Sequence, residues 1–455
     1  MNSLPEQWIV MEIGQVGEVV AGGTPSTKKD EYWGTDICWI TPLDLSGYKE
    51  KYISKGRKSL TKLGLEKSSA RLIPKDSILF SSRAPIGYVA VAANELATNQ
   101  GFKNLIPSPI IESDFLYYYF KSIKKMAYEL ASGTTFKELS AARFAKIPVP
   151  VPPKKEQQVI VEKIEELFSD LDNAVENLQK AREQLKVYRQ SILKNAFEGK
   201  LTNKNVKEGE LPKGWKIFPL KQIVKTIDGD RGHNYPKKDE FYEEGYCLFL
   251  STKNVRQGKF VFEENIFISK EKDEILKGGK LQLNDVVVTT RGTLGNVALY
   301  DNKIPFKNVR LNSGMLILRV LNQQVLDNYY LMKFISSPFF NKQLKEKQSG
   351  TAQPQIPANV LREIQIPLPS STKEQKTIVA EIESRFSVCD QMEETIETSL
   401  KQAEALRQSI LKQAFDGKLT EQWRKDYPDL ISGENSAAAL LAKIKAEKEA
   451  LKKKK

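Results

Sequence analysis

The sequence predicts an α+β protein in which two mixed α/β modules alternate with two long helices, as a pseudo-twofold internal repeat. Three observations support this fold class. A motif at residues 188–202 recurs at residues 406–420, apolar residues before each copy follow a helical spacing, and segments further upstream contain short strand-like apolar runs. The expected parts are, in order, 1–146, 147–202, 203–363, 364–420 and a C-terminal extension, 421–455, whose end we expect to be frayed.

The repeat is closest at the two helix ends. Within residues 188–202 and 406–420, positions 189–202 and 407–420 share the pattern Arg-Gln-Ser-Ile-Leu-Lys-x-Ala-Phe-[Glu/Asp]-Gly-Lys-Leu-Thr. Upstream, the helix entry at residues 155–157 and the one at residues 373–375 both read Lys-Glu-Gln after a proline-rich stretch. Matches of this length indicate duplication rather than coincidence.

The modules match more loosely. Each opens on Leu-Pro-x-x-Trp, ending at Trp8 and at Trp215, and Arg83 corresponds to Arg291 before a glycine-bearing turn. The offset between the copies drifts along the modules, which predicts insertions in loops. The two modules therefore share a frame and differ in content.

The helical segments carry the apolar pattern of a coiled coil. Between residues 160 and 192, and again between 378 and 410, apolar or small residues alternate at spacings of four and three, which is typical of a left-handed coiled-coil seam. The predicted seam residues are Ile160, Ile164, Leu167, Leu171, Leu178, Leu185, Ile192, Ile378, Ile382, Met392, Ile396, Leu406 and Ile410. A helix of this length spans about 50 Å, and Gly199 and Gly417 stand where C-cap glycines belong. We expect the two helices to pair antiparallel and to hold the modules at opposite ends.

Strand-like runs fall at residues 77–80, 88–91, 286–288 and 316–318, and amphipathic helices are predicted late in each module, at residues 115–130 and 327–346.

The excess positive charge lies in the modules. Residues 1–146 carry 19 basic and 15 acidic side chains and residues 203–363 carry 26 and 18, whereas 147–202 and 364–455 are nearly neutral, within a total of +13. Two basic modules suggest two surfaces for a polyanion. The alternative is a solubility charge that is unevenly distributed.

Composition excludes several classes. No apolar run approaches the roughly 18 residues of a membrane span, and no secretory signal is visible, so we expect a soluble cytoplasmic protein. The three cysteines lie far apart without metal-ligand spacing, and the one histidine, His233, is expected in an exposed loop.

Catalytic motifs are absent from the sequence. It has no phosphate-binding GxxxxGK[ST] loop and no [DN]PP[YF] element of an amino-methyltransferase. Residues 374–376 resemble the last part of a nuclease motif, but at a helix start a capping carboxylate is the better interpretation for Glu374. We predict no catalytic residue, no metal site and no cofactor on this chain.

The chain resembles the specificity (S) subunit of type I restriction–modification systems over essentially its whole length. The resemblance is carried by the repeated helix ends, the Lys-Glu-Gln helix entries, the Leu-Pro-x-x-Trp openings and the Arg-x-x-[Ile/Leu]-Gly elements. The resemblance implies that 1–146 and 203–363 are target-recognition domains, each reading half of a bipartite, asymmetric DNA target. It further implies that the paired helices set the spacing and bind two modification (methyltransferase) subunits, directing adenine methylation or restriction. Restriction subunits would join that core, and S-adenosylmethionine, ATP and Mg would be bound by the partners only.

Candidate DNA contacts are polar residues in loops of the modules. Arginine and lysine suit guanine edges or phosphates, and glutamine suits adenine. The candidates are Arg83, Gln100, Lys103, Thr134, Thr135, Lys137, Lys253, Asn254, Arg291, Arg310, Gln353 and Gln355. Because Arg83 and Arg291 are retained between otherwise divergent modules, phosphate contact or a structural ion pair is favoured over base reading for them.

Two other functions remain open at this point. A coiled-coil scaffold whose two lobes bind proteins would show no salt-sensitive DNA binding, and it would leave the localised charge unexplained. A self-contained nuclease or methyltransferase would give product from the isolated chain with DNA and metal or methyl donor.

Overall fold

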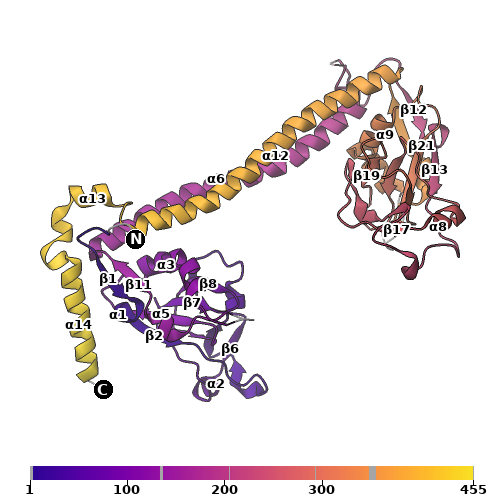
Figure 1. The fold of residues 1–455 in the computed structure, drawn as a ribbon. Coiled ribbons are helices and arrows are strands. Elements are labelled where there is room, and N and C mark those ends of the chain that lie inside the picture. Colours follow the sequence, from indigo (N-terminus) through magenta and orange to yellow (C-terminus); the bar gives the residue numbers. More distant parts are fainter. Residues whose placement is uncertain (1–3, 134–136, 204, 293, 348–354, 454–455) are drawn as a thin grey trace. The chain divides into compact units, whose positions relative to one another are not determined.

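The computed structural model describes residues 4–133, 137–203, 205–292, 294–347 and 355–453 (Figure 1). The chain divides into two compact units, residues 1–177 with 399–455, and residues 178–398. Helices α6 (Lys154–Phe197) and α12 (Thr372–Phe415) are each divided between the units, with one stretch in the first unit and the other in the second. Each unit therefore contains one module and a part of each long helix.

The first module contains a twisted central sheet with strand order β2-β10-β7-β8-β5, a smaller sheet β3-β6-β4-β9, and a two-stranded sheet β1-β11 next to the long helix. Its elements are β1 (Ile9–Glu12), α1 (Ile13–Val16), β2 (Gly17–Ala21), β3 (Trp33–Gly34), β4 (Ile37–Ile40), β5 (Tyr52–Ile53), β6 (Lys58–Leu60), α2 (Lys62–Glu66), β7 (Ile78–Ser82), β8 (Ile86–Ala92), β9 (Ala97–Thr98), β10 (Lys103–Pro107), α3 (Ser113–Ser122), α4 (Lys124–Leu130), α5 (Ala141–Ala145) and β11 (Pro148–Val151).

The second module repeats this frame with different additions. Its sheets are β13-β21-β18-β19, β17-β14-β20, the hairpin β15-β16 and the pair β12-β22. Its elements are β12 (Lys216–Pro219), α7 (Leu220–Ile223), β13 (Val224–Asp228), β14 (Cys247–Leu250), β15 (Val255–Arg256), β16 (Lys259–Phe260), β17 (Phe267–Ile268), α8 (Lys270–Ile275), β18 (Val286–Thr289), β19 (Val297–Leu299), β20 (Val309–Leu311), β21 (Met315–Val320), α9 (Asn328–Ile335), α10 (Pro338–Lys347), α11 (Ala358–Arg362) and β22 (Gln365–Leu368). The C-terminal extension forms α13 (Glu421–Asp426) and α14 (Ala437–Lys453).

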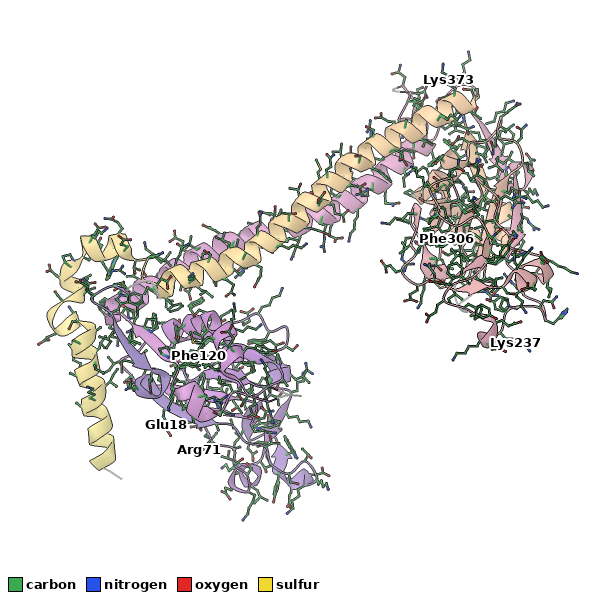
Figure 2. All side chains as sticks on the ribbon, viewed as in Figure 1. Glu18, Arg71, Phe120, Lys237, Phe306 and Lys373 are labelled. Atoms are coloured by element: carbon green, nitrogen blue, oxygen red, sulfur yellow. The ribbon has the colours of Figure 1, made fainter. Side chains whose placement is uncertain are left out.

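The predicted strands are confirmed because their apolar runs are buried on both faces. In β7 and in β18 every residue is buried, between a helix-covered face and a second apolar cluster. The predicted amphipathic helices each divide in two, into α3 and α4 and into α9 and α10. Helix α3 places Phe115 and Phe120 in the core shared with α6 and α12, and Figure 2 shows Phe120 in the interior of its module.

Within each unit α6 and α12 run antiparallel. In the first unit Ile164 of α6 belongs to the same core as Ile410 and Ala414 of α12, and in the second Ile192 shares a core with Ile378 and Ile382. Eight predicted seam residues are buried, namely Ile160, Ile164, Leu171, Ile192, Ile378, Ile382, Ile396 and Ile410. Leu178 and Leu185 are half-buried.

Three positions of one predicted seam row are wrong, although Ile160 and Ile378 of the same row are buried as predicted. Leu167, Met392 and Leu406 are exposed, with relative exposures of 36%, 51% and 48%. The residues that follow them in the repeat, such as Phe168 and Arg407, turn inward instead. There the guanidinium of Arg407 lies 4.9 Å from the ring centroid of Phe168, a contact that is attractive because the aromatic face is electron-rich.

The motifs shared by both repeats meet at one point in each unit. In the first unit the carboxylate of Glu156, at the start of α6, is fully buried. It accepts hydrogen bonds from Trp8 Nε1 at 2.9 Å and from Thr420 Oγ1 at 2.6 Å, and Arg424 forms a 2.5 Å ion pair with it. The module opening, the helix start and the opposite helix end are therefore fastened together.

The second unit contains the same arrangement in weaker form. Glu374 accepts from Trp215 Nε1 at 3.2 Å and from Asn203 Nδ2 at 3.4 Å. Glu374 was expected to cap α12, but the hydroxyl of Ser371 accepts a hydrogen bond from the Glu374 backbone N–H at 3.3 Å, and the carboxylate binds the tryptophan.

The predicted C-cap glycines are confirmed. Gly199 and Gly417 have φ of 73° and 74°, and a Cβ at either position would meet a proline of the Leu-Pro-x-x-Trp opening, Pro212 or Pro5, within 2.5 Å. Glycine is therefore required both for the left-handed turn and for the close approach of the module.

Among the described residues no helix is long and apolar enough to cross a membrane. His233 lies exposed in a loop, as expected.

Candidate nucleic-acid interface

Arg83 lies directly after β7, where the chain leaves the central sheet of the first module. Its NH1 atom is 3.7 Å from Oε2 of Glu138, and both side chains are about two-fifths exposed (37% and 42%). The backbone fixes this pair, since Leu139 N–H donates to the carbonyl of Ser82 at 2.9 Å and Arg83 bridges to Glu138. The pair is rigidly placed and open to solvent.

Lys103 does not lie on this surface. Its side chain is only 8% exposed, and its Nζ lies 3.3 Å from Glu138 Oε1, 3.2 Å from Ser82 Oγ and 3.4 Å from the carbonyl of Gln100. The prediction of a direct DNA contact is therefore wrong for the conformation described. A buried ammonium needs such partners, and here it supports Glu138 from below.

Gln100 is exposed at the turn into β10, where its side-chain oxygen accepts a hydrogen bond from the hydroxyl of Thr24. Next to it, Asn99 accepts from the backbone N–H of Gly101 at 2.9 Å, and Asn312 does the same for Gly314. Both asparagines therefore form turns beside the candidate contacts.

Backbone hydrogen bonds establish which residues of the second module occupy the same places. Ser82 N–H donates to the carbonyl of Gly101, and Thr290 N–H donates to that of Gly314. Just as Leu139 N–H bonds to Ser82, Ile356 N–H bonds to Thr290 at 3.0 Å. Glu138 therefore corresponds to Gln355.

The strand registers extend this correspondence. Ala21 pairs with Lys103 in the first module, and Asp228 pairs with Leu316 in the second. Leu316 thus takes the place of Lys103.

In the second module these positions line a polar cavity of about 300 Å³, with Arg291 and Gln355 in its wall together with Arg231, Asp228, Thr290 and Leu316. Arg291 is exposed, and within the described ranges no ion pair involves it. Arg231 NH2 lies 3.0 Å from Asp228 Oδ1 and 3.4 Å from the carbonyl of Ser313.

The loop that carries Arg231 is fixed by Asp230. Its carboxylate accepts hydrogen bonds from the backbone N–H groups of Gly232 at 3.1 Å and Lys277 at 2.9 Å. These bonds hold the pKa of Asp230 below its usual range.

Two further candidates of the second module are buried within it. Asn254 is 3% exposed and donates to the carbonyls of Val261 and Glu264, so it closes a turn. Arg310 is 4% exposed and binds Asp273 through Nε at 2.8 Å. Neither offers a free donor to DNA, which corrects both predictions. Sequence patterns could not reveal this burial, because it depends on strands distant in the chain.

The remaining candidates are exposed or lie outside the described residues. Lys253 is exposed and paired with Glu264 at 2.7 Å, and the ammonium of Lys137 lies 4.1 Å from the ring centroid of Tyr128. Thr134, Thr135 and Gln353 are outside the described residues.

Sequence reasoning missed Thr24, Arg231 and Glu138. Thr24 and Arg231 meet predicted candidates only through contacts between segments distant in the chain, and Glu138, although it follows Lys137, meets Arg83 and Lys103 only through such contacts. A second missed surface lies beside β6, where Lys58 lies 5.1 Å from the ring centroid of Trp33 and both line a pocket with Arg57.

No group of metal-ligating side chains occurs within the described ranges. The arrangement at the two module surfaces can bind and orient a polar ligand, with arginine, amide and carboxylate groups converging from loops.

Comparison with known proteins assigns a family. The family model described as "Type I restriction modification DNA specificity domain" matches residues 5–186 and 212–402. The specificity subunit of the type I restriction enzyme MjaIX of Methanocaldococcus jannaschii is 34% identical over 78% of this chain and 82% of its own. That of EcoKI from Escherichia coli K12 is 29% identical over 99% of this chain and 97% of its own.

Solved structures share the fold. A chain from a study of assembly and conformational transition in a type I restriction–modification system has a TM-score of 0.68 at 18% identity, covering 92% of this chain and all of its own. The HsdS subunit of Thermoanaerobacter tengcongensis gives 0.55 at 18% identity, covering 91% of this chain and 98% of its own.

Proposed function

Because the chain belongs to the family of type I restriction–modification DNA specificity subunits, we propose that it reads DNA sequence for such a complex. Each module reads one half of a bipartite, asymmetric target, as target-recognition domains at 1–146 and 203–363. The chain itself does no chemistry, and it directs adenine methylation or restriction by its partners.

The observation that carries this proposal is the pair of module surfaces. They occupy equivalent places after β7 and β18, are built on the same backbone hydrogen bonds, and share one arginine, Arg83 or Arg291. Their other side chains differ. Two readers of different base sequences need a common way to approach the phosphates and different contacts to base edges.

Exposed contacts retained in the proposal are Arg83, Gln100 and Lys137 in the first module, and Lys253, Arg291 and Gln355 in the second. Thr134, Thr135 and Gln353 remain candidates. Lys103, Asn254 and Arg310 act from within the modules.

The helices present a second, repeated surface. Gln190, Ser191 and Lys194 of α6 are matched by Gln408, Ser409 and Lys412 of α12, and all six are exposed or half-exposed. Solvent-facing positions need no particular side chain for folding, so their identity supports two copies of one partner. We assign this surface to two modification (methyltransferase) subunits.

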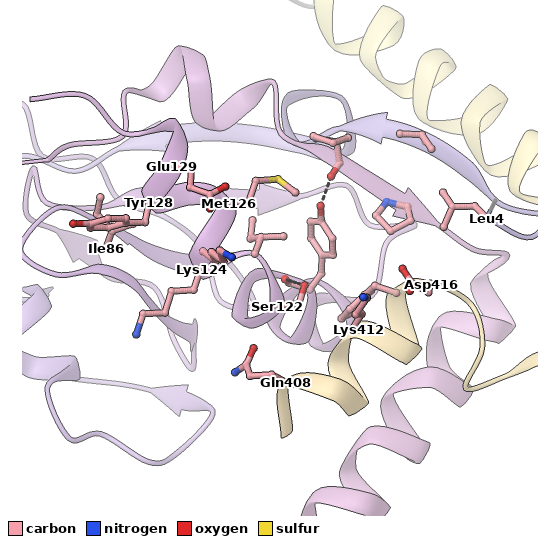
Figure 3. Close-up of a pocket in the computed structure, with 17 residues that line it drawn as sticks. Leu4, Ile86, Ser122, Lys124, Met126, Tyr128, Glu129, Gln408, Lys412 and Asp416 are labelled. Atoms are coloured by element: carbon pink, nitrogen blue, oxygen red, sulfur yellow. Dashed lines mark hydrogen bonds between the residues drawn. The ribbon is translucent and has the colours of Figure 1, made fainter. Parts of the chain in front are cut away.

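An apolar groove adjoins this surface in the first unit (Figure 3). Its volume is about 960 Å³, and Gln408 and Lys412 form its wall with Met126 and Tyr128 of α4. Val10, which also lines the groove, is 59% exposed, and its counterpart Ile217 in the second unit is 54% exposed. Exposed apolar side chains at equivalent places fit a partner contact in both units.

The wider complex follows from the proposal. Paired helices that separate two readers would set the spacing between half-sites. Restriction subunits would join the methyltransferase core, and S-adenosylmethionine, ATP and Mg would be bound by these partners. A subunit acting on host and incoming DNA works in the cytoplasm.

The test is the methylation pattern of the host genome with and without this gene. The expected result is a bipartite methylated motif that disappears on deletion and returns on complementation. In vitro, the chain with its methyltransferase subunits should prefer duplexes that contain the motif, with a log–log salt slope of about −0.9 per phosphate contact. An unchanged methylation pattern together with equal affinity for motif and random duplexes would contradict the proposal and favour a protein-binding scaffold.

A further inference from the structure

Five positions come together at the same place in both modules. In the first they are Thr24, Arg83, Gln100, Lys103 and Glu138, and in the second Arg231, Arg291, Ser313, Leu316 and Gln355. The contact from Thr24 to Gln100 has its counterpart in the contact from Arg231 to the carbonyl of Ser313. Only the arginine after β7 and β18 is shared, and we call these ten residues the five-position clusters.

Residues that serve the frame are kept between the modules. Trp8 and Trp215 bind equivalent glutamates, and Asn99 and Asn312 close the turns beside the clusters. The clusters differ from these retained structural residues, because four of their five side chains diverge between the modules although matching hydrogen bonds hold the backbone.

The two clusters keep the same charge balance by different means. In the first, Arg83 and Lys103 face one carboxylate, Glu138. In the second, Arg231 pairs with the carboxylate of Asp228, which lies beside the cluster, and Arg291 lines the same cavity, while the uncharged Leu316 and Gln355 replace the lysine and the glutamate. When Asp228 is counted with the second cluster, each cluster thus keeps one excess positive charge for a polyanion and presents a different set of donors and acceptors.

We infer that the five-position clusters determine the sequence specificity of the two modules, with the shared arginine on a backbone phosphate and the divergent exposed side chains on base edges. This inference rests on the proposed function. In the second module the guanidinium of Arg231 suits O6 and N7 of guanine and the amide of Gln355 suits N6 and N7 of adenine. In the first, Gln100 suits adenine and Glu138 accepts from N4 of cytosine.

Within the second module the different roles of Arg231 and Arg291 follow from their surroundings. Arg231 is held in one orientation by Asp228 and by the carbonyl of Ser313. A base contact requires a fixed donor geometry, which such support provides. Arg291 has no ion pair within the described ranges, and a phosphate, which accepts from many directions, does not require one.

The experiment compares variants of the full chain in complex with its methyltransferase subunits. Gln355→Glu places the first module's side chain in the second cluster, and Arg291→Ala removes the shared arginine. The matched control is Lys303→Ala, which removes one exposed positive charge beyond β19, at the opposite end of β18 and β19 from Arg291. Affinity is measured on a motif duplex and a random duplex across salt concentrations, and the methylated motif is determined by sequencing.

Gln355→Glu should weaken binding to the motif duplex roughly 10- to 100-fold and change the bases accepted in one half-site only. Arg291→Ala should weaken both duplexes equally and reduce the salt slope by about 0.9. Lys303→Ala should leave the motif unchanged and cost about twofold or less. An unchanged motif and affinity in a folded Gln355→Glu complex would overturn the inference, as would an Arg291→Ala complex that changes the accepted bases.

Two measurements keep these outcomes separate from other causes. Thermal melting shows whether each variant folds, and Glu138→Gln provides the reciprocal change in the first module, which should alter the other half-site alone. A Glu138→Gln variant that changes the same half-site as Gln355→Glu would also overturn the inference. If the wild-type complex shows no preference for any duplex, the proposed function itself fails.

Discussion

The guanidinium of Arg407 lies over the ring of Phe168, with its central carbon 4.9 Å from the ring centroid, and it forms an ion pair with Asp172. The second unit contains the same contact between α6 and α12. There Arg189 lies 5.3 Å from the centroid of Phe386 and 2.6 Å from Asp390. The duplicated contact explains why arginine occupies a row that a simple coiled coil would fill with leucine.

Arg407→Ala should destabilise the first unit by about 1–2 kcal/mol, the sum of a partly desolvated cation–π contact and a half-exposed ion pair. The measurement is urea denaturation followed by circular dichroism. Lys186→Ala on α6 is the matched control, because Lys186 forms an exposed ion pair with Glu183 on the same helix and should cost much less than Arg407→Ala. Equal losses in the two variants would show that the contact across the helices adds nothing.

Glu156→Gln should cost more stability than Glu374→Gln, although the two glutamates occupy the same place in the repeat. Glu156 is fully buried and paired with Arg424, and losing one partner of a buried ion pair costs about 3–5 kcal/mol. Glu374 accepts from Trp215 and Asn203 and has no such cation among the described residues, so about 1 kcal/mol is expected.

The comparison uses denaturation midpoints of both variants, with Arg424→Met as a further control that should reproduce much of the Glu156→Gln loss. If Glu374→Gln proves the more damaging change, the buried ion pair does not strengthen the first unit.

The parts of the structure that follow from short-range patterns could be predicted from the sequence. The helix spacing, the Gly199 and Gly417 caps and the apolar strands each depend on neighbouring residues. The wrong seam positions show the limit of prediction from such patterns. Leu167 and Phe168 are both apolar, and Phe168 is the one that is buried, where it packs against Arg407 across the helices.

Only part of the candidate site could be predicted, because some of its contacts depend on packing between distant segments. Arg83 and Arg291 were found through the repeat, and both are solvent-accessible. The burial of Lys103 and Arg310, and the match of Glu138 with Gln355, depend on hydrogen bonds between strands far apart in sequence, which a loop comparison without a register cannot supply.

Asp230 should make the second unit sensitive to acid. Backbone hydrogen bonds from Gly232 and Lys277 lower its folded-state pKa, so its stabilising effect is complete above the unfolded value near 3.9 and is lost as pH falls through the lower folded value. Asp230→Asn should therefore lower the free energy of unfolding at pH 7. Below about pH 3 the free energies of unfolding of the variant and the wild type should lie closer together.

The measurement is the denaturation midpoint of both proteins at the two pH values. The same variant should weaken motif binding at neutral pH, because the loop that carries Arg231 loses its support. A stability difference that stays constant between the two pH values would contradict the role of the charge.

Replacing residues 203–363 by the corresponding module of a relative should change one half-site of the methylated motif and leave the other intact. The junctions can accept such an exchange because β12 pairs with β22 through backbone hydrogen bonds, in a register from Lys216 opposite Leu368 to Pro219 opposite Gln365. The incoming module must supply the tryptophan that binds Glu374 and the proline that contacts Gly199, and the family motif Leu-Pro-x-x-Trp contains both. Sequencing of methylated DNA from cells carrying the chimera with its methyltransferase subunits checks the outcome. Since the five-position cluster of the first module lies wholly within residues 24–138, a change in both half-sites would mean that the modules do not read independently.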